Sequence, residues 1–197
     1  MTIPNLITAH QKKVTVTKLQ KAISVINQAY KMSYDENGEP DYEEVQQLGI
    51  KSYFDKYWAP YLKGVTYCNS HEVCGYKFND EIKALDGNYG TTLVYNNRVS
   101  FYTLDGFLYI IYIKMPEGAD FGRTITVDIN GFRKPNVYGK DVFELERNIE
   151  NGSVQTWGNY LSNSLINSNC SKKGSGYYCS EKIRRAGWQI DKSYPWN

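Results

Sequence analysis

Residues 1–33 read MTIPNLITAHQKKVTVTKLQKAISVINQAYKMS, and this stretch decides the fold. Apolar side chains recur in it at spacings of three or four residues, which places them on one stripe of a helix. The stripe consists of Val16, Leu19, Ile23, Ile26 and Tyr30. A helix from Pro4 to Ser33 would be roughly 45 Å long at about 1.5 Å per residue. That is long for a chain of 197 residues, so we expect the helix to belong to an assembly larger than this chain.

The two ends of this helix differ in character. Apolar residues open it around Pro4, and no Ser, Thr or Asp cap precedes them. The acidic, turn-rich run from Asp35 to Asp41 follows it and is expected to form a solvated loop. We therefore divide the chain into an N-terminal amphipathic helix, residues 1–33, and a globular head, residues 34–197.

Composition narrows the class of protein. Hydrophobic residues make up 41% and charged residues 22% of the chain, which is ordinary for a globular protein. The net charge of +2 gives no electrostatic footprint for nucleic acid. The aromatic share of 15% suits an extracytoplasmic, β-rich protein. The sequence shows neither a membrane-spanning apolar stretch nor a secretory signal peptide.

The four cysteines form two local pairs, Cys68 with Cys74 and Cys170 with Cys179. Neither pair has the C-x-x-C spacing of a zinc knuckle or a redox site. We expect two short-loop disulfides, each worth perhaps ~2–3 kcal/mol. Four cysteines allow three connectivities, and only proximity favours this one. Disulfides imply an oxidising compartment; a zinc site that includes His71, or free thiols, are the alternatives.

The middle of the chain changes from helical to strand periodicity. One or two short helices are expected over Tyr42–Leu62, with Gly49 and Pro60 as breaks. Four strands joined by short turns follow and predict an antiparallel meander. Asn96-Asn97 forms the expected turn between the first two strands. The predicted strands are Thr91–Tyr95, Arg98–Thr103, Phe107–Lys114 and Arg123–Ile129.

The predicted fold class is therefore α+β. A long N-terminal helix packs on an antiparallel β-meander, with loop-rich, disulfide-stapled insertions before and after it. From Gly131 onward we expect little regular structure. The tail Ile183–Trp196 should form a short helix and an extended end against the sheet.

The segment from Asp128 to Asp141 is the one place where side chains suggest a ligand. Oxygen-bearing residues one position apart, then Gly131, then a further aspartate resemble the way loops surround Ca²⁺. The segment is no EF-hand, because Phe132 and Lys134 intrude and the bidentate glutamate is missing. The alternative is a strand-ending turn in which Asp and Asn side chains accept hydrogen bonds from local backbone N–H groups.

Catalytic motifs do not emerge. The chain has two histidines, His10 and His71, and lacks a nucleophile elbow, a P-loop or an H-E-x-x-H motif. Its carboxylates are explained by a solvated surface, so an enzyme is not expected.

Three blocks of the chain resemble a known family. Met-Thr-Ile-Pro-Asn-Leu-Ile at residues 1–7, with the Lys-bearing helix after it, resembles the type IV pilins and type II secretion pseudopilins. It looks like the point where that family's N-terminal helix leaves the membrane, with Pro4 matching the kinking proline. VDINGFRKPNVYGKDVFEL (127–145) and GYYCSEKIRRAGWQIDKSYPW (176–196) are similar to stretches of the same proteins. Residues 34–90 carry no such likeness.

The resemblance implies a structural, non-enzymatic subunit of a pilus or secretion pseudopilus, used for adhesion, motility or secretion. Its expected partners are like subunits and the assembly machinery at the inner membrane, with DNA only in an uptake pilus. The subunit would be membrane-anchored before assembly and then part of a cell-surface or periplasmic filament. The apolar anchor and cleavage motif that precede this point in the family are absent, which suggests that the anchor has been removed.

The same resemblance implies particular residues. Ile3, Pro4, Leu6 and Ile7 would lie in the filament core, and Asp128, Asn130, Asn136 and Asp141 would be the calcium ligands. The alternative function is a secreted, calcium-dependent module that binds a glycan or a receptor through its aromatic surface.

Overall fold

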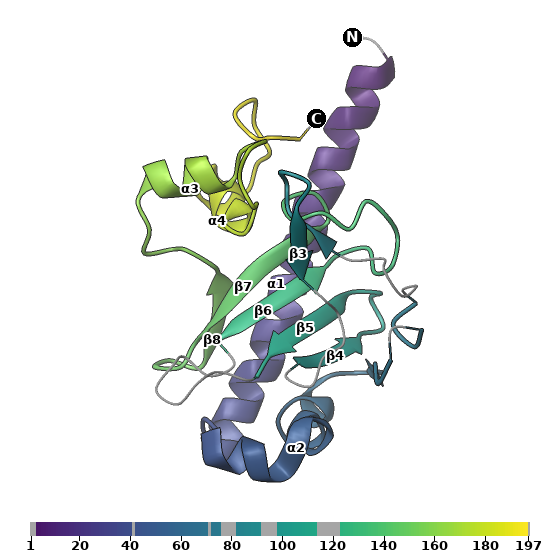
Figure 1. The fold of residues 1–197 in the computed structure, drawn as a ribbon, viewed down its shortest axis with the longest axis vertical. Coiled ribbons are helices and arrows are strands. Elements are labelled where there is room, and N and C mark those ends of the chain that lie inside the picture. The colour runs from purple at the N-terminus through teal and green to yellow at the C-terminus, as the bar shows by residue number, and fades with distance from the viewer. Residues whose placement is uncertain are drawn as a thin grey trace.

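The computed structural model describes residues 3–40, 42–70, 72–75, 82–91, 98–113 and 123–196. In Figure 1 the longest helix runs along the long axis of the molecule, behind a sheet, and its N-terminal turns extend beyond the other elements. The predicted α+β class is confirmed. The elements are, in chain order, α1 (Ile3–Asn37), α2 (Tyr42–Tyr57), η1 (Ala59–Tyr61), β1 (Thr66–Tyr67), β2 (Ile82–Lys83), β3 (Tyr89–Thr91), β4 (Arg98–Tyr102), β5 (Leu108–Tyr112), β6 (Thr124–Asp128), β7 (Val142–Asn148), β8 (Ser153–Thr156), α3 (Asn163–Asn169) and α4 (Cys179–Arg185).

The main sheet has six strands in the order β1-β4-β5-β6-β7-β8, and every neighbouring pair is antiparallel. From β4 to β8 each strand pairs with the next in the chain, which is the predicted meander. Alternation along the strands gives the sheet two faces. One register row crosses it as Ser100, Ile110, Thr126 and Glu144.

The inner face of the sheet packs on α1. Val16, Leu19, Ile26 and Tyr30 of the predicted stripe are buried, and Ile23 is partly buried against the same core. Each fully buried Leu or Ile contributes about 1.5–3 kcal/mol. Polar bonds fix the position of the helix: Tyr109 Oη donates to the Ala22 carbonyl at 2.8 Å, and Val154 N donates to Asn27 Oδ1 at 2.6 Å. This core runs from α1 into the sheet.

The outer face carries a second, two-stranded sheet of β2 and β3. Lys83 N donates to the Asn136 carbonyl at 3.0 Å and Tyr138 N donates to the Lys83 carbonyl at 2.9 Å, which ties β2 to the loop before β7. Thr91 therefore ends a strand that pairs with β2 and not with β4. The rest of the predicted strand to Tyr95 and the Asn96-Asn97 turn lie outside the described residues.

Glycines set the ends of the helices before the sheet. α1 continues four residues past the predicted end at Ser33, and Gly38 follows it with φ 71° and donates its N–H to the Tyr34 carbonyl at 2.9 Å. Gly49, with φ 76° and ψ 165°, breaks α2 into two helical segments, as predicted. The acidic run thus begins inside the helix.

The expectation of little regular structure after Gly131 is wrong. This region forms the seven-residue strand β7, the strand β8 and the helices α3 and α4. Its charged residues suggested exposure, yet Glu144, Glu146 and Arg147 of β7 are all buried. Arg147 is paired with Glu39, at 2.8 Å between Nη1 and Oε1. Partners from distant segments are what a local pattern cannot reveal.

Both predicted disulfides are confirmed. Cys68 is bonded to Cys74 beside β1, and Cys170 is bonded to Cys179 between α3 and α4. The two bonds indicate an extracytoplasmic location. His71 lies outside the described residues.

Candidate functional site

The N-terminal part of α1 exposes apolar side chains. Leu6 is 61% and Ile7 is 53% exposed, and Val16 is the first fully buried side chain among those described in α1. Ile3 and Pro4 belong to the first turn of α1, and their side chains lie outside the described residues. The helix therefore exposes apolar side chains near its N-terminus and buries its apolar stripe from Val16 onward.

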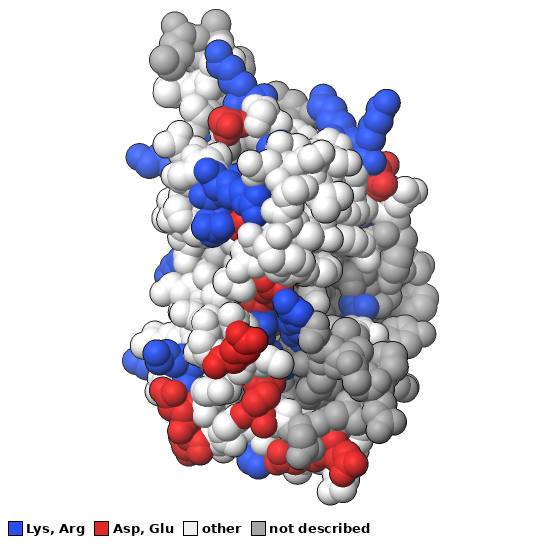
Figure 2. Space-filling model, turned by 90° about the vertical axis from the view of Figure 1, so that its left-hand side faces the viewer, with Lys and Arg blue, Asp and Glu red and all other residues white. Residues whose placement is uncertain are grey.

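Charge is also divided along α1 and the segment after it. Between Ile3 and Tyr34 the chain carries five lysines and no acidic residue, whereas Asp35 to Glu44 carries six acidic residues and no basic one. Asp35 and Glu36 lie at the C-terminal end of α1 and oppose its macrodipole, whereas Glu43 and Glu44 lie in the first turn of α2, where the macrodipole favours them. Figure 2 shows the same trend on one face, with acidic side chains gathered at the lower end and mainly basic ones above.

The loop from Asp128 to Asp141 brings three of the four predicted ligands together. The Asp141 carboxylate accepts hydrogen bonds from Asn136 N at 2.9 Å, Val137 N at 2.8 Å and Asn130 Nδ2 at 3.0 Å. The fourth, Asp128, accepts one from Asn130 N at 3.0 Å. These bonds are those of the alternative interpretation, in which Asp side chains organise a turn.

Two oxygens in this loop have no partner. The side-chain carbonyl oxygens of Asn130 and Asn136 are buried without a hydrogen bond. Burial raises the pKa of Asp141, and its backbone and side-chain donors lower it by less. Two amide oxygens and two carboxylates are oxygen ligands of the type that Ca²⁺ takes, so the residues fit this ion in kind. The part of the chain that the structure describes contains no cluster of three His, Cys, Asp or Glu side chains suited to a metal.

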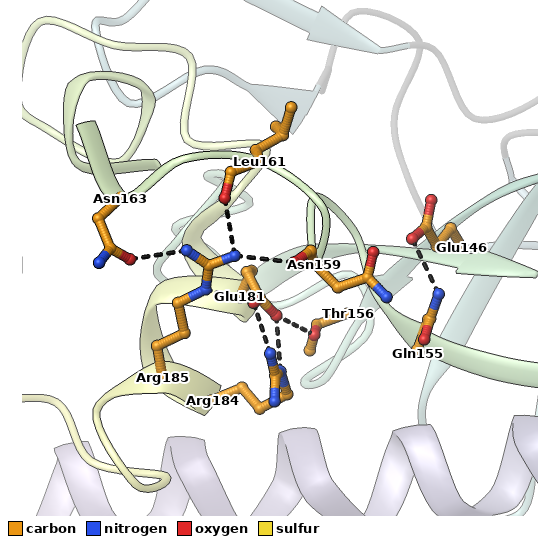
Figure 3. A network of polar contacts seen from close by, with 9 residues as sticks. All are labelled: Glu146, Gln155, Thr156, Asn159, Leu161, Asn163, Glu181, Arg184 and Arg185. Atoms are coloured by element: carbon orange, nitrogen blue, oxygen red, sulfur yellow. Dashed lines mark hydrogen bonds and ion pairs between the residues drawn. The ribbon is translucent and has the colours of Figure 1, made fainter. Parts of the chain in front are cut away.

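A buried carboxylate anchors α4 to the sheet (Figure 3). The fully buried Glu181 accepts bonds from Arg184 Nε and Nη2 at 2.7 Å, from Arg185 Nε at 2.6 Å and from Thr156 Oγ1 at 2.5 Å. Burial raises the pKa of Glu181, but the bonds from Arg184, Thr156 and Arg185 outweigh it and hold the pKa below its usual range. Arg185 also donates to the carbonyls of Asn159 and Leu161 at 2.9 Å. The network therefore fixes the loop after β8.

A further candidate site lies on the outer face of the sheet, around Glu144, and it was not predicted from the sequence. This carboxylate lines a small cavity together with Tyr138, Trp157 and Tyr177. The sequence feature that could have indicated this site is the aromatic pair Trp157 and Tyr177, within a segment rich in Asn, Ser and Gly. The segments that carry these residues meet only in the folded chain.

Comparison with protein families gives one assignment. The sequence profile of the family of unknown function DUF6613 matches residues 5–103, just over half of the chain. The chain belongs to this family. The DUF6613 match covers α1, α2, the first disulfide and β4, whereas the loop 128–141 and the second disulfide lie beyond it. Comparisons with curated proteins and with solved structures gave no match.

Among the described helices of this DUF6613 chain, none combines the length and the apolar character that crossing a membrane requires.

Proposed function

We propose that the chain is a structural, non-enzymatic subunit of a filament of the type IV pilus or type II secretion pseudopilus kind. The observation that carries the proposal is the division of α1. Its apolar stripe is buried in the core from Val16 onward, whereas Leu6 and Ile7, nearer its N-terminus, are exposed. A single exposed leucine is ordinary, but a projecting helix with an apolar stripe gains stability when like helices cover it.

The charge division supports packing of many copies in one direction. Four of the five lysines lie between Lys12 and Lys21, toward the middle of α1, whereas the acidic segment 35–44 begins in its last turn. In a staggered, head-to-tail array the basic part of one subunit faces the acidic end of the next. Such a heterologous contact does not close on itself and generates a filament.

We propose that the subunit acts outside the cytoplasm, where both disulfides persist. We propose that the subunit is anchored in the inner membrane before assembly. Assembly machinery at that membrane would then extract the subunit into a cell-surface or periplasmic filament.

Assembly of charged variants tests the proposal. Leu6→Glu and Ile7→Glu should abolish recovery of the protein in sheared filaments, because a charge would enter the helix contact. Leu165→Glu on α3 is the matched control, since Leu165 is 54% exposed and lies outside α1. The free energies of unfolding of the three variants should stay within about 0.5 kcal/mol of the wild-type value, as for other exposed positions. Normal filaments from Ile7→Glu would refute the proposal.

For the loop 128–141 we propose calcium as the ligand, held by Asp128, Asn130, Asn136 and Asp141. Support comes from the two buried amide oxygens without partners. The ion would stabilise the fold by about 2.7 kcal/mol at one hundred times its Kd. Thermal unfolding in CaCl₂ should show this shift, MgCl₂ should not, and Asp128→Asn should weaken it. Equal melting temperatures with CaCl₂ and with EDTA would contradict the proposal.

A further inference from the structure

A cavity of about 190 Å³ opens on the outer face of the sheet, away from α1. Its floor comes from β5, β6 and β7, where Ile110, Thr126 and Glu144 lie in one register row. The cavity is smaller than the roughly 300–1,000 Å³ of sites for drug-sized ligands. A cavity of this volume therefore suits a ligand with a single ring and not a ligand made of a long chain.

Aromatic rings form the walls of this cavity. The rings of Tyr138 and Tyr177 meet edge to face with centroids 4.8 Å apart, and Trp157 stacks on Tyr177 at 6.2 Å. Trp157 and Tyr177 both line the cavity and are only partly buried. Tyr138 packs so closely on Gly90 that a Cβ there would lie 2.8 Å from the ring.

One polar atom in the floor lacks a partner. Glu144 Oε1 accepts hydrogen bonds from Tyr138 Oη at 2.7 Å and Thr126 Oγ1 at 2.8 Å, whereas Oε2 is buried without any. The residue is only 5% exposed. An unsatisfied buried acceptor costs about 1–3 kcal/mol, so a ligand that donates to Oε2 recovers this free energy.

Two classes of ligand combine a donor with affinity for aromatic faces: organic cations and sugars. The cavity already contains one cation, because Arg98 lines it, with its guanidinium 5.3 Å from the Tyr112 ring centroid. A second cation beside Arg98 would be repelled. A neutral sugar ring packs its C–H face on an aromatic ring, and its hydroxyl groups both donate and accept.

We propose that this pocket binds one neutral pyranose ring, packed against Trp157 and donating a hydroxyl hydrogen to Glu144 Oε2. The site does not depend on filament assembly, so a failure of either proposal leaves the other standing.

The partly buried rings of Trp157 and Tyr177 come from segments that are distant in the sequence. Trp157 directly follows β8, and its N–H donates to the Glu144 carbonyl at 3.4 Å. Tyr177 lies inside the loop that the Cys170–Cys179 disulfide closes, and Ser180 Oγ donates to the same Glu144 carbonyl at 2.6 Å. The second disulfide thereby closes the loop that brings Tyr177 to the pocket.

The test uses the purified chain and a panel of methyl pyranosides with gluco, galacto, manno and N-acetylglucosamine configuration. Ligand-observed and protein-observed NMR titrations measure the Kd of each. At least one should bind with a Kd in the millimolar range, and Trp157→Leu and Glu144→Gln should each weaken it about tenfold or more. Trp188→Leu and Glu150→Gln, which lie outside the pocket, should bind like wild type. NMR spectra of all variants establish that they are folded.

The corresponding free sugars, titrated beside the methyl pyranosides, distinguish the source of the ring. Binding that survives an anomeric methyl group indicates the terminal residue of a glycan, and binding of the free sugar alone indicates a monosaccharide. Absence of saturable binding up to about 50 mM, well above a typical weak Kd of about 1 mM, would overturn the proposal. Tighter binding of methylammonium than of every sugar, or unchanged affinity in Trp157→Leu, would overturn it as well.

Discussion

At the scale of single residues, two buried glutamates behave in opposite ways. Glu144 has two neutral hydroxyl donors, and burial raises its pKa to about 7 in spite of them. Glu181 has two arginines, whose hydrogen bonds hold its pKa below the usual value against the effect of burial. Direct hydrogen bonds from two arginines favour the ionised form of Glu181, whereas at Glu144 burial outweighs the hydroxyl donors and the nearby Arg98.

Glu144→Gln should change how stability depends on pH. Since the folded-state pKa of Glu144 lies above its unfolded value of 4.5, the folded state binds more protons between pH 4.5 and 7. Its stabilising contribution is present below pH 4.5 and is lost as pH rises through 7, by roughly 3 kcal/mol. Denaturant unfolding at pH 4.5, 6 and 8 should show this loss in wild type and a smaller one in the variant. Equal slopes in the two proteins would contradict the assignment.

Glu181→Gln should destabilise the fold. Loss of the carboxylate removes charge-assisted bonds from Arg184 and Arg185, whose side chains are 44% and 26% exposed and so regain water. We expect a loss of about 1–3 kcal/mol at pH 7, which shrinks as pH falls below the ordinary glutamate value. Urea unfolding measures it, with the exposed Glu150→Gln as control. An effect no larger than that of the control would disprove the anchoring role.

At the scale of elements, α1 consists of two parts with different energetics. Leu19→Ala removes a fully buried side chain from the helix–sheet core and should cost about 2–5 kcal/mol. Leu6→Ala changes an exposed side chain and should stay within about 0.5 kcal/mol of wild type. Thermal or urea unfolding of the isolated chain compares them. Similar losses in both variants would mean that the first turns of α1 are covered after all.

The elements also show what local sequence can predict. α1 and β6 were predicted because their apolar residues follow one period over a whole element, and β5 because its residues form a near-continuous apolar and aromatic run. β7 was missed, since Glu144, Glu146 and Arg147 interrupt its pattern and find partners in other segments. The loop 128–141 was located correctly, but the bonds that converge on Asp141 depend on the folded turn. The pocket at Glu144 could not be predicted, because the rings that line it come from separate segments.

At the scale of the whole molecule, the protein is a body with a projecting helix and with opposite charges along its length. Contacts between exposed charges weaken with salt, since the Debye length falls from about 8 Å at 0.15 M to about 3 Å at 1 M. Association through the lysine-rich part of α1 should therefore weaken at 1 M NaCl, whereas the apolar contact at Leu6 and Ile7 should persist. Sedimentation of isolated filaments at both salt concentrations measures the difference. Complete insensitivity to salt would argue against the staggered charge contact.

The most direct test of the central claim is site-specific photo-cross-linking in cells that assemble the protein. A photoreactive amino acid replaces Ile7 in one variant and Leu165 in another, two positions of nearly equal exposure at 53% and 54%. The account predicts a ladder of subunit multimers from position 7 and little or none from position 165. Equal cross-linking from both positions, or none from position 7, would contradict the claim that the end of α1 is the assembly surface.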